Sequence, residues 1–225
     1  TTLTATDVDS SDPSTFTFST VSPPTNIIGS VNIGDVVQAG NGTFTAVATY
    51  THDGSETLSD SFTYKVNDGT NDSNIPTVTI SAITPINDAP IAATVSGSGN
   101  EGGTITTTLT ATDVDNSVPS AFTFSIVSQP TNMTGSVSIA TPTYSSGTFT
   151  ADATYIHDGS ETTSDSFTYK ANDGTADSNI STATITTSAV NDAPIATSVN
   201  GSGSEGGTIT TTLTATDVDN SDPSA

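Results

Sequence analysis

Residues 105–115 read Ile-Thr-Thr-Thr-Leu-Thr-Ala-Thr-Asp-Val-Asp. The apolar residues Ile105, Leu109 and Ala111 share one parity, and threonines occupy every position of the other parity as far as Thr112. Successive side chains of a β-strand point to opposite faces, so this period of two predicts a strand with one face in a core. Threonine is β-branched and polar, which favours a strand whose other face meets water.

The end of this stretch recurs along the chain. The string TTLTATDVD occurs at residues 1–9, 107–115 and 211–219. A repeat of about 100 residues has the size of an independent β-sandwich, whereas solenoid repeats of about 20–50 residues need their neighbours to bury a core. The repeat therefore predicts tandem modules: a module lacking its first strand over 1–88, a complete module over 89–192, and the N-terminal strands of a third over 193–225.

Other segments of the complete module alternate in the same way. Apolar residues occupy every second position over 122–126, 149–155 and 167–171. Shorter candidate strands lie at 94–96, 136–139 and 182–189. About seven strands per module, separated by turn residues and without a helical period, are typical of an immunoglobulin-like Greek-key sandwich. The predicted fold is all-β, a string of tandem immunoglobulin-like Greek-key β-sandwiches.

The composition excludes several classes of protein. Two Lys and Arg stand against 24 Asp and Glu, and the formal net charge is -22. Nucleic acids and anionic membrane surfaces are bound by clustered cations, so neither is an expected partner. Without a run of about 18 apolar residues, direct membrane insertion is not expected. The chain has no cysteine, which excludes disulfides, so core burial and bound metal are the means left to stabilise the modules.

Acidic side chains recur once per module, at predicted strand ends and loops. In the complete module they are Asp113 and Asp115, Asp158 and Glu161, Asp173, and the linker residue Asp192, which follows the amide Asn191. Calcium takes six to eight oxygen ligands from flexible loops, and this inventory is rich in oxygen and free of sulfur. Simpler interpretations stay open, because Asn-Asp-Gly is an ordinary hairpin turn, Asn-Asp-Ala-Pro an ordinary linker, and Glu101 a candidate solvated loop acid.

The order of these motifs resembles that of cadherin-type repeats, especially the bacterial cadherin-like and VCBS-type tandem repeats of large secreted, RTX-type adhesins. The resemblance covers the whole chain and implies Ca²⁺ bound at the junctions between modules. At the first junction it implies the ligands Asp53, Glu56, Asn87, Asp88, Asp113, Asp115 and Asp173. At the second it implies the ligands Glu101, Asp158, Glu161, Asn191, Asp192, Asp217 and Asp219. The linker is shorter than the family's, which implies fewer or weaker ions per junction.

The resemblance also implies a secreted, cell-surface protein that acts in cell adhesion or as a structural spacer, with neighbouring repeats as its partners. One alternative is a self-assembling extracellular filament or sheath subunit joined by strand exchange. Another is a glycan-binding module. An enzyme is not expected, because the polar groups recur with the fold and none pairs a nucleophile with a base. His52 and His157 end equivalent strands, which favours a structural role for both.

Overall fold

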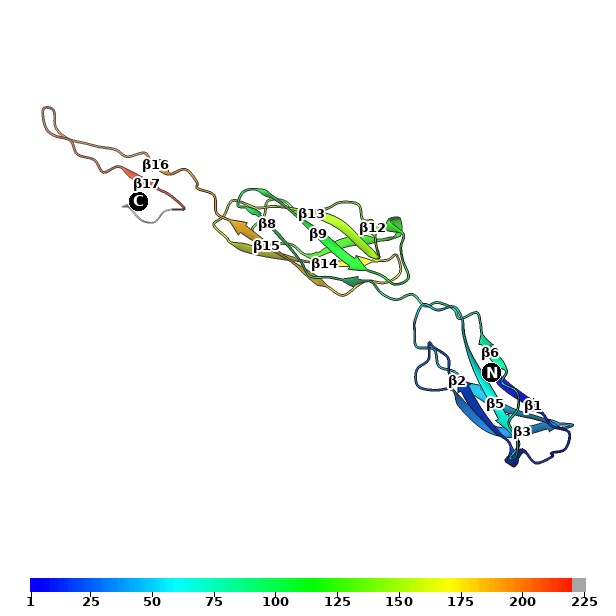
Figure 1. Cartoon of the computed structure of the whole chain (residues 1–225). Coiled ribbons are helices and arrows are strands. Elements are labelled where there is room, and N and C mark those ends of the chain that lie inside the picture. The colour runs from blue at the N-terminus through cyan, green and yellow to red at the C-terminus, as the bar shows by residue number, and fades with distance from the viewer. Residues whose placement is uncertain (220–225) are drawn as a thin grey trace. The chain divides into compact units, whose positions relative to one another are not determined.

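The computed structural model describes residues 1–219, and the chain divides into two compact units, Thr1–Ile86 and Asn87–Ala225. We call them the first unit and the second unit and describe each by itself. Both consist of β-strands, with the short 3-10 turns η1 (Pro13–Thr15) and η2 (Pro119–Ala121) between them (Figure 1). Among the described residues, no helix is long and apolar enough to cross a membrane. The prediction of an all-β, immunoglobulin-like fold is confirmed.

Two sheets form the sandwich of the second unit, ordered β10-β14-β15-β8 and β11-β13-β9-β7, with β12 paired to β13. The strands of the first sheet are β10 (Thr123–Ser128), β14 (Ser164–Asn172), β15 (Ser181–Ser188) and β8 (Val95–Asn100). Those of the second sheet are β11 (Ser138–Ile139), β13 (Thr148–Ile156), β9 (Thr104–Thr112), β7 (Ile91–Ala92) and β12 (Thr143–Ser145). Strands β15 and β8 run parallel, and the other paired strands run antiparallel.

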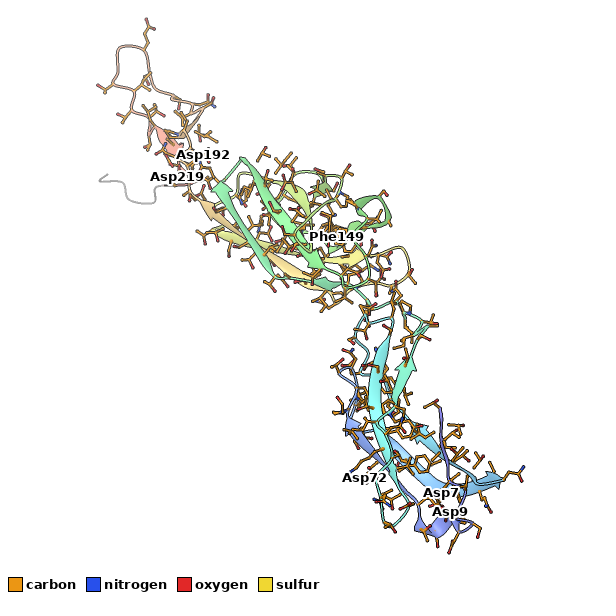
Figure 2. All side chains as sticks on the ribbon, turned by 45° about the vertical axis from the view of Figure 1, so that its right-hand side comes forward. Asp7, Asp9, Asp72, Phe149, Asp192 and Asp219 are labelled. Atoms are coloured by element: carbon orange, nitrogen blue, oxygen red, sulfur yellow. The ribbon has the colours of Figure 1, made fainter. Side chains whose placement is uncertain are left out.

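The core of the second unit lies between these sheets. Strand β9 buries Ile105, Leu109 and Ala111, as its alternation predicts. Phe149 of β13 is fully buried (labelled in Figure 2) and stacks on Phe122 with a ring-centroid distance of 3.8 Å. Aromatic side chains bury large apolar areas, so a few of them supply most of the burial in a thin sandwich rich in threonine.

Strand β8 lies too close to β9 for side chains at its inward positions. A Cβ at Gly97 would lie 1.9 Å from Oγ1 of Thr107, and a Cβ at Gly99 would lie 2.5 Å from Cγ1 of Ile105. Glycine is therefore required at both positions by the close approach of the two strands. The sequence predicts only 94–96 as a strand here, because glycine adds nothing to an apolar alternation.

The first unit repeats this plan with two three-stranded sheets, ordered β1-β4-β3 and β2-β5-β6. The strands are β1 (Thr2–Thr6), β2 (Thr17–Ser22), β3 (Asn32–Gly40), β4 (Thr43–Thr49), β5 (Asp60–Asn67) and β6 (Thr77–Ile80). Phe16 stacks on the fully buried Phe44 with a ring-centroid distance of 3.8 Å. The aromatic pair at the centre of the core is thus the same in both units.

The last strands of the chain form a hairpin. Strand β16 (Ile195–Thr197) pairs antiparallel with β17 (Thr214–Thr216), and every residue of both strands is exposed. The division into modules at 88 and 192 stays a prediction. Residues 220–225 of the predicted third module lie outside the described residues.

Candidate metal centre

Three carboxylates converge at one end of the second unit. Glu101, Glu161 and Asp219 each place one carboxylate oxygen within 4.8 Å of the others. Glu101 lies in the turn between β8 and β9, Glu161 in the loop between β13 and β14, and Asp219 follows β17. The three residues come from distant parts of the sequence, so the fold is what gathers them.

Glu101 is buried, with 8% of its surface exposed. Its Oε1 accepts a hydrogen bond from the backbone N–H of Val190 at 2.5 Å, and its own N–H donates to the carbonyl of Ser188 at 3.0 Å. Its Oε2 is buried and has no hydrogen-bond partner among the described residues. A buried carboxylate oxygen without a donor is costly, so this atom favours a cation beside it. The alternative of a solvated loop acid is wrong for Glu101.

The charges around Glu161 also favour a bound cation. The pKa of Glu161 is raised by partial desolvation and then by the negative charges of Glu101, Asp219 and Asp192. Ionised Glu161 has no proton to donate to Glu101, whereas protonated Glu161 can donate one, and this hydrogen bond also raises the pKa of Glu161. When both groups are ionised, a multivalent cation is the natural counter-charge.

The linker is fixed to the same end by backbone hydrogen bonds. The N–H of Asp192 donates to Oδ2 of Asp219, whose own N–H donates to Oδ1 of Asp217 at 3.0 Å. Figure 2 shows Asp192 and Asp219 close together. The side-chain amide of Asn191 donates to the carbonyl of Asp192 at 2.8 Å. These contacts place further oxygen atoms of the linker near the three carboxylates.

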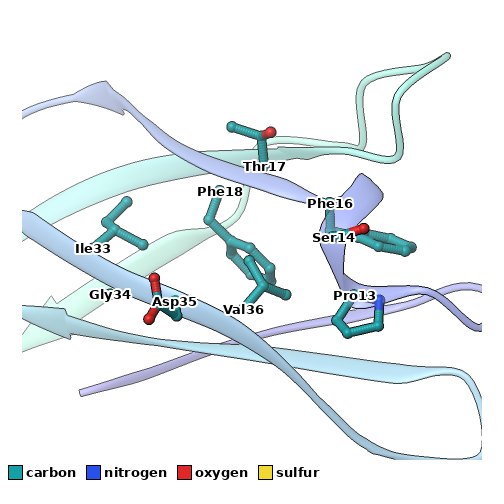
Figure 3. A pocket seen from close by; sticks show the side chains of 9 residues that line it. All are labelled: Pro13, Ser14, Phe16, Thr17, Phe18, Ile33, Gly34, Asp35 and Val36. Carbon is teal, nitrogen blue, oxygen red and sulfur yellow. The ribbon is translucent and has the colours of Figure 1, made fainter.

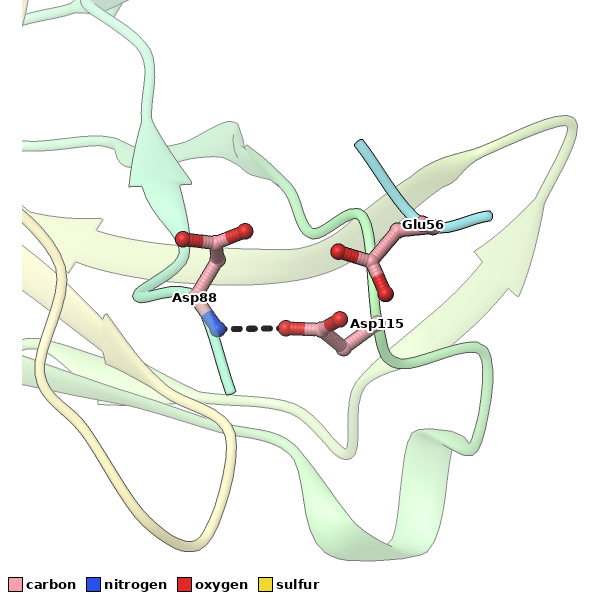
Figure 4. Close-up of side chains that lie close together, drawn as sticks. All are labelled: Glu56, Asp88 and Asp115. Carbon is pink, nitrogen blue, oxygen red and sulfur yellow. Dashed lines mark hydrogen bonds between the residues drawn. The ribbon is translucent and has the colours of Figure 1, made fainter. Parts of the chain in front are cut away.

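The opposite end of the second unit repeats this linker arrangement. The N–H of Asp88 donates to Oδ2 of Asp115 at 2.5 Å (Figure 4), and the N–H of Asp115 donates to Oδ1 of Asp113 at 2.9 Å. The amide of Asn87 donates to the carbonyl of Asp88 at 3.0 Å. Oδ2 of Asp113 is buried and has no hydrogen-bond partner in the described part of the chain. Both ends therefore combine an Asn-Asp linker with an Asp-x-Asp pair.

Asp173 accepts hydrogen bonds both within its own turn and from the linker residue Asn87. Its Oδ1 accepts from the N–H groups of Thr175 and Ala176 at 2.6 and 2.7 Å, while its Oδ2 accepts from the amide of Asn87 at 2.9 Å. Burial opposes ionisation, but the hydrogen bonds from Ala176, Asn87 and Thr175 outweigh it and lower the pKa of Asp173. The carboxylate is therefore held ionised, and part of its bonding capacity belongs to the turn.

Asp53 and Asp158 hold turns and are not among the converging carboxylates. Oδ1 of Asp53 accepts from the N–H of Ser55 at 3.0 Å, and Oδ1 of Asp158 accepts from the N–H of Ser160 at 3.0 Å. The hydrogen bonds from these serines lower the pKa of both carboxyls. Glu56 follows the same turn in the first unit and is exposed.

His157 joins the two turns that carry Glu101 and Glu161. It is buried, its Nδ1 accepts from the backbone N–H of Gly102 at 3.3 Å, and its Nε2 lies 2.9 Å from Oγ1 of Thr162. Gly102 follows Glu101 in the chain and Thr162 follows Glu161, so the imidazole links the two turns from which these glutamates extend. The repeated His-Asp-Gly-Ser-Glu string indicates a structural role, and the link to Glu101 emerges only from the fold.

A surface hollow of the first unit lies between η1, β2 and β3 (Figure 3). Phe16, Phe18, Val36 and Asp35 are among its lining residues. Asp35 is the one titratable side chain of that lining, so the hollow holds no acid and base in reach of each other.

The second unit is similar to a known family of bacterial domains. Residues 87–186 match the model of the Bacterial Ig domain family. No curated protein matches the chain. Similar solved structures include the endo-fucoidan hydrolase MfFcnA4 from glycoside hydrolase family 107 (18% identity, TM-score 0.34, 78% of this chain and 24% of that one). They also include protocadherin gamma B2 extracellular cadherin domains 3-6 (17% identity, TM-score 0.47, 83% of this chain and 45% of that one). A third is the Escherichia coli adhesin FdeC (16% identity, TM-score 0.33, 85% of this chain and 58% of that one). The chain spans 24% of the hydrolase, and at these identities the likeness concerns the fold alone.

Proposed function

We propose that this chain belongs to an extracellular array of adhesin repeats of the cadherin-like, VCBS type, in which Ca²⁺ bound at the module ends stiffens the array. Two observations carry the proposal: the carboxylates of Glu101, Glu161 and Asp219 converge, and Oε2 of Glu101 is buried with no donor among the described residues. In this role the array holds an adhesive region away from the cell surface.

The spacing of the carboxylates suits one ion. Calcium lies about 2.3–2.6 Å from its oxygen ligands, so two ligands of one ion are at most about 5 Å apart. The oxygens of Glu101, Glu161 and Asp219 lie within 4.8 Å of one another and meet this limit. Oxygen donors alone favour a hard cation, and flexible acidic loops accommodate calcium more readily than the strict octahedron of magnesium.

Stiffening follows from where the ligands lie in the chain. Glu101 and Glu161 precede the linker at 189–194, and Asp219 follows it. An ion bound by all three would tie the sandwich to the hairpin of β16 and β17. Without the ion, the charges that raise the pKa of Glu161 would repel one another. Extracellular calcium sites typically have dissociation constants of about 10⁻⁴ to 10⁻³ M, which suits a site filled outside the cell.

The test is calorimetric titration of the 225-residue chain with calcium, comparing Glu161→Gln with Asp158→Asn. Both changes remove one negative charge from the same loop, but only Glu161 belongs to the converging group. We expect Glu161→Gln to weaken one binding event and Asp158→Asn to leave it unchanged. Equal weakening by both variants, or by neither, would exclude this site.

A further inference from the structure

The chain enters the sandwich of the second unit through β7 and β8 and leaves it through β15. Strands β8 and β15 run parallel and lie side by side (Figure 1). Six residue pairs are in register, from Val95 opposite Ala183 to Asn100 opposite Ser188. The start of β8 and the end of β15, where the chain enters and leaves this pair, are therefore at opposite ends of the pair.

This arrangement decides how tension along the chain acts on the two strands. A pull on the backbone at Pro90 and at Val190 would slide β8 along β15, so the evenly spaced hydrogen bonds of the parallel ladder would share the load. An antiparallel hairpin pulled at its two free ends opens one residue pair at a time. Forced unfolding depends on the barrier to unfolding, and this barrier is higher when several hydrogen bonds must break together.

Strand β8 depends on its backbone hydrogen bonds because it places little side-chain volume in the core. Its inward positions include Gly97 and Gly99, where an added Cβ would lie 1.9 and 2.5 Å from side-chain atoms of β9. Val95 packs against the core at the start of the strand. The pairing with β15, rather than the burial of side chains, is therefore the main attachment of β8.

Further hydrogen bonds hold the backbone where the chain enters this pair. The side chain of Asn179 accepts from the N–H of Ala92 at 2.9 Å and donates to the carbonyl of the same residue at 3.0 Å. The hydroxyl of Tyr169 donates to the carbonyl of Ala93, whose N–H donates to the carbonyl of Thr110 at 3.1 Å. A load that arrives from the preceding linker therefore meets these contacts before it reaches β8.

Glu101 holds the backbone where the chain leaves the pair. This residue directly follows β8, and its N–H donates to the carbonyl of Ser188 at 3.0 Å. Its Oε1 accepts from the N–H of Val190 at 2.5 Å, which extends the pairing by one side chain beyond the end of β15. Hydrogen bonds to a carboxylate are stronger than those between neutral groups, so this contact reinforces the end at which a load from the following linker arrives.

We propose that the second unit bears tension along the chain, with β8 and β15 as the strands that resist it and with Asn179 and Glu101 as the residues that hold the two ends of the pair. This function goes beyond stiffening by a bound ion, because the contacts that carry it are hydrogen bonds within one sandwich. The resistance depends on direction: it is high when the load runs along the two strands and low when they are separated from one end.

Single-molecule force measurements on the full chain, in chelator, test this dependence on direction. The native chain has no cysteine, so introduced cysteines serve as attachment points. Ala89→Cys with Ala193→Cys applies the load along the pair, whereas Asn100→Cys with Ala193→Cys applies it where β8 and β15 end side by side. All three positions are exposed. We expect a several-fold higher rupture force for the first attachment, because the second opens the ladder one residue pair at a time.

Two asparagine variants test the contact at the entry of the chain. With the first attachment held at constant force, Asn179→Ala should unfold about tenfold faster, because it removes both hydrogen bonds to Ala92. Asn132→Ala is the control, because its side-chain amide donates to Thr131 in a different loop, and it should not change the rate. With the second attachment, Asn179→Ala should also leave the rate unchanged, because the load enters the chain beyond Ala92.

Equal rupture forces for the two attachments would overturn the proposal. Equal unfolding rates of the two asparagine variants under the first attachment would also overturn it. All these measurements are made without metal. A second unit that resists the two loads equally but still takes up calcium would therefore leave the proposed function standing.

Discussion

The carboxylate of Glu101 accepts the backbone N–H of Val190 through Oε1, while its Oε2 is buried and without a partner among the described residues. Oε1 thus fixes the start of the linker, and the same carboxylate converges with those of Glu161 and Asp219. The same side chain therefore holds the linker and contributes a negative charge to the cluster. We therefore expect a cation bound by the three carboxylates to change the environment of the Val190 N–H.

Glu101→Gln should affect the second unit differently with and without calcium. In chelator, the amide removes a buried negative charge next to Glu161 and Asp219, so we expect the variant to be about 1 kcal/mol more stable to unfolding than the native chain. With calcium in excess, the native chain gains stability by mass action and the variant gains less. Thermal unfolding in the two buffers measures both effects, and an equal calcium-dependent rise in melting temperature would contradict the account.

Phe149→Ala should weaken the second unit specifically. Phe149 is fully buried and stacks on Phe122, so its truncation removes both burial and the stack. We expect a loss of about 3–5 kcal/mol in the free energy of unfolding. Phe44→Ala is the matched variant of the first unit. In calorimetric scans each variant should lower the melting temperature of its own unit and leave that of the other unit unchanged. A single transition that both variants shift would contradict this and show that the units unfold together.

Gly97→Val should destabilise the second unit through steric overlap. A Cβ at Gly97 would lie 1.9 Å from Oγ1 of Thr107, which is itself buried. Overpacking of this kind typically costs about 1–3 kcal/mol. Gly34→Val makes the same change in strand β3, where the nearest atom, the carbonyl of Val47, is 3.6 Å from the added Cβ. Urea unfolding should separate the two variants, and equal stability would refute the close approach of β8 to β9.

The stability of the first unit should fall in acid through Asp60. Burial opposes ionisation of this carboxyl, but hydrogen bonds from the N–H groups of Asn26 and Ser61 and from the hydroxyl of Tyr50 outweigh it and lower its pKa to about 2. An unfolded Asp has a pKa of about 3.9. The stabilisation is therefore complete above about pH 4 and is lost as the pH falls through about 2.

Asp60→Asn checks this pH dependence. The variant should be less stable than the native chain at neutral pH, and the difference should shrink as the pH approaches 2. The exposed Asp35 gives a control, because Asp35→Asn removes the same charge from β3. Urea midpoints at a series of pH values are the measurement. A difference between Asp60→Asn and the native chain that stays constant with pH would be inconsistent with the lowered pKa.

The sequence predicts the strands in which apolar and polar residues alternate regularly. It misses strands that are short or whose residues are determined by close contact with another strand. Strand β9 follows directly from Ile105, Leu109 and Ala111, which are buried as expected. Strand β8 extends beyond its predicted part because Gly97 and Gly99 are set by contact with another strand, which a linear pattern does not contain. The short strand β12 also lacks a long enough alternation to be found.

The residues of the candidate site can likewise be predicted from the sequence only in part. Recurrence along the chain singles out the acidic residues, because function and turn formation both keep them in each repeat. Recurrence does not distinguish Asp158, whose Oδ1 accepts the N–H of Ser160, from Glu161, which converges with Glu101. That distinction depends on burial and on contacts between residues far apart in the chain.

The most direct measurement of the central claim is calcium titration by calorimetry of Glu101→Gln beside Glu205→Gln. Glu205 occupies the same Glu-Gly-Gly motif but is exposed, so the two variants differ in environment and not in chemistry. We predict that the native chain and Glu205→Gln bind calcium alike and that Glu101→Gln loses about tenfold in affinity for one ion. Identical binding by all three chains would contradict a calcium site at Glu101. So would the absence of calcium uptake by the native chain at concentrations well above about 10⁻³ M.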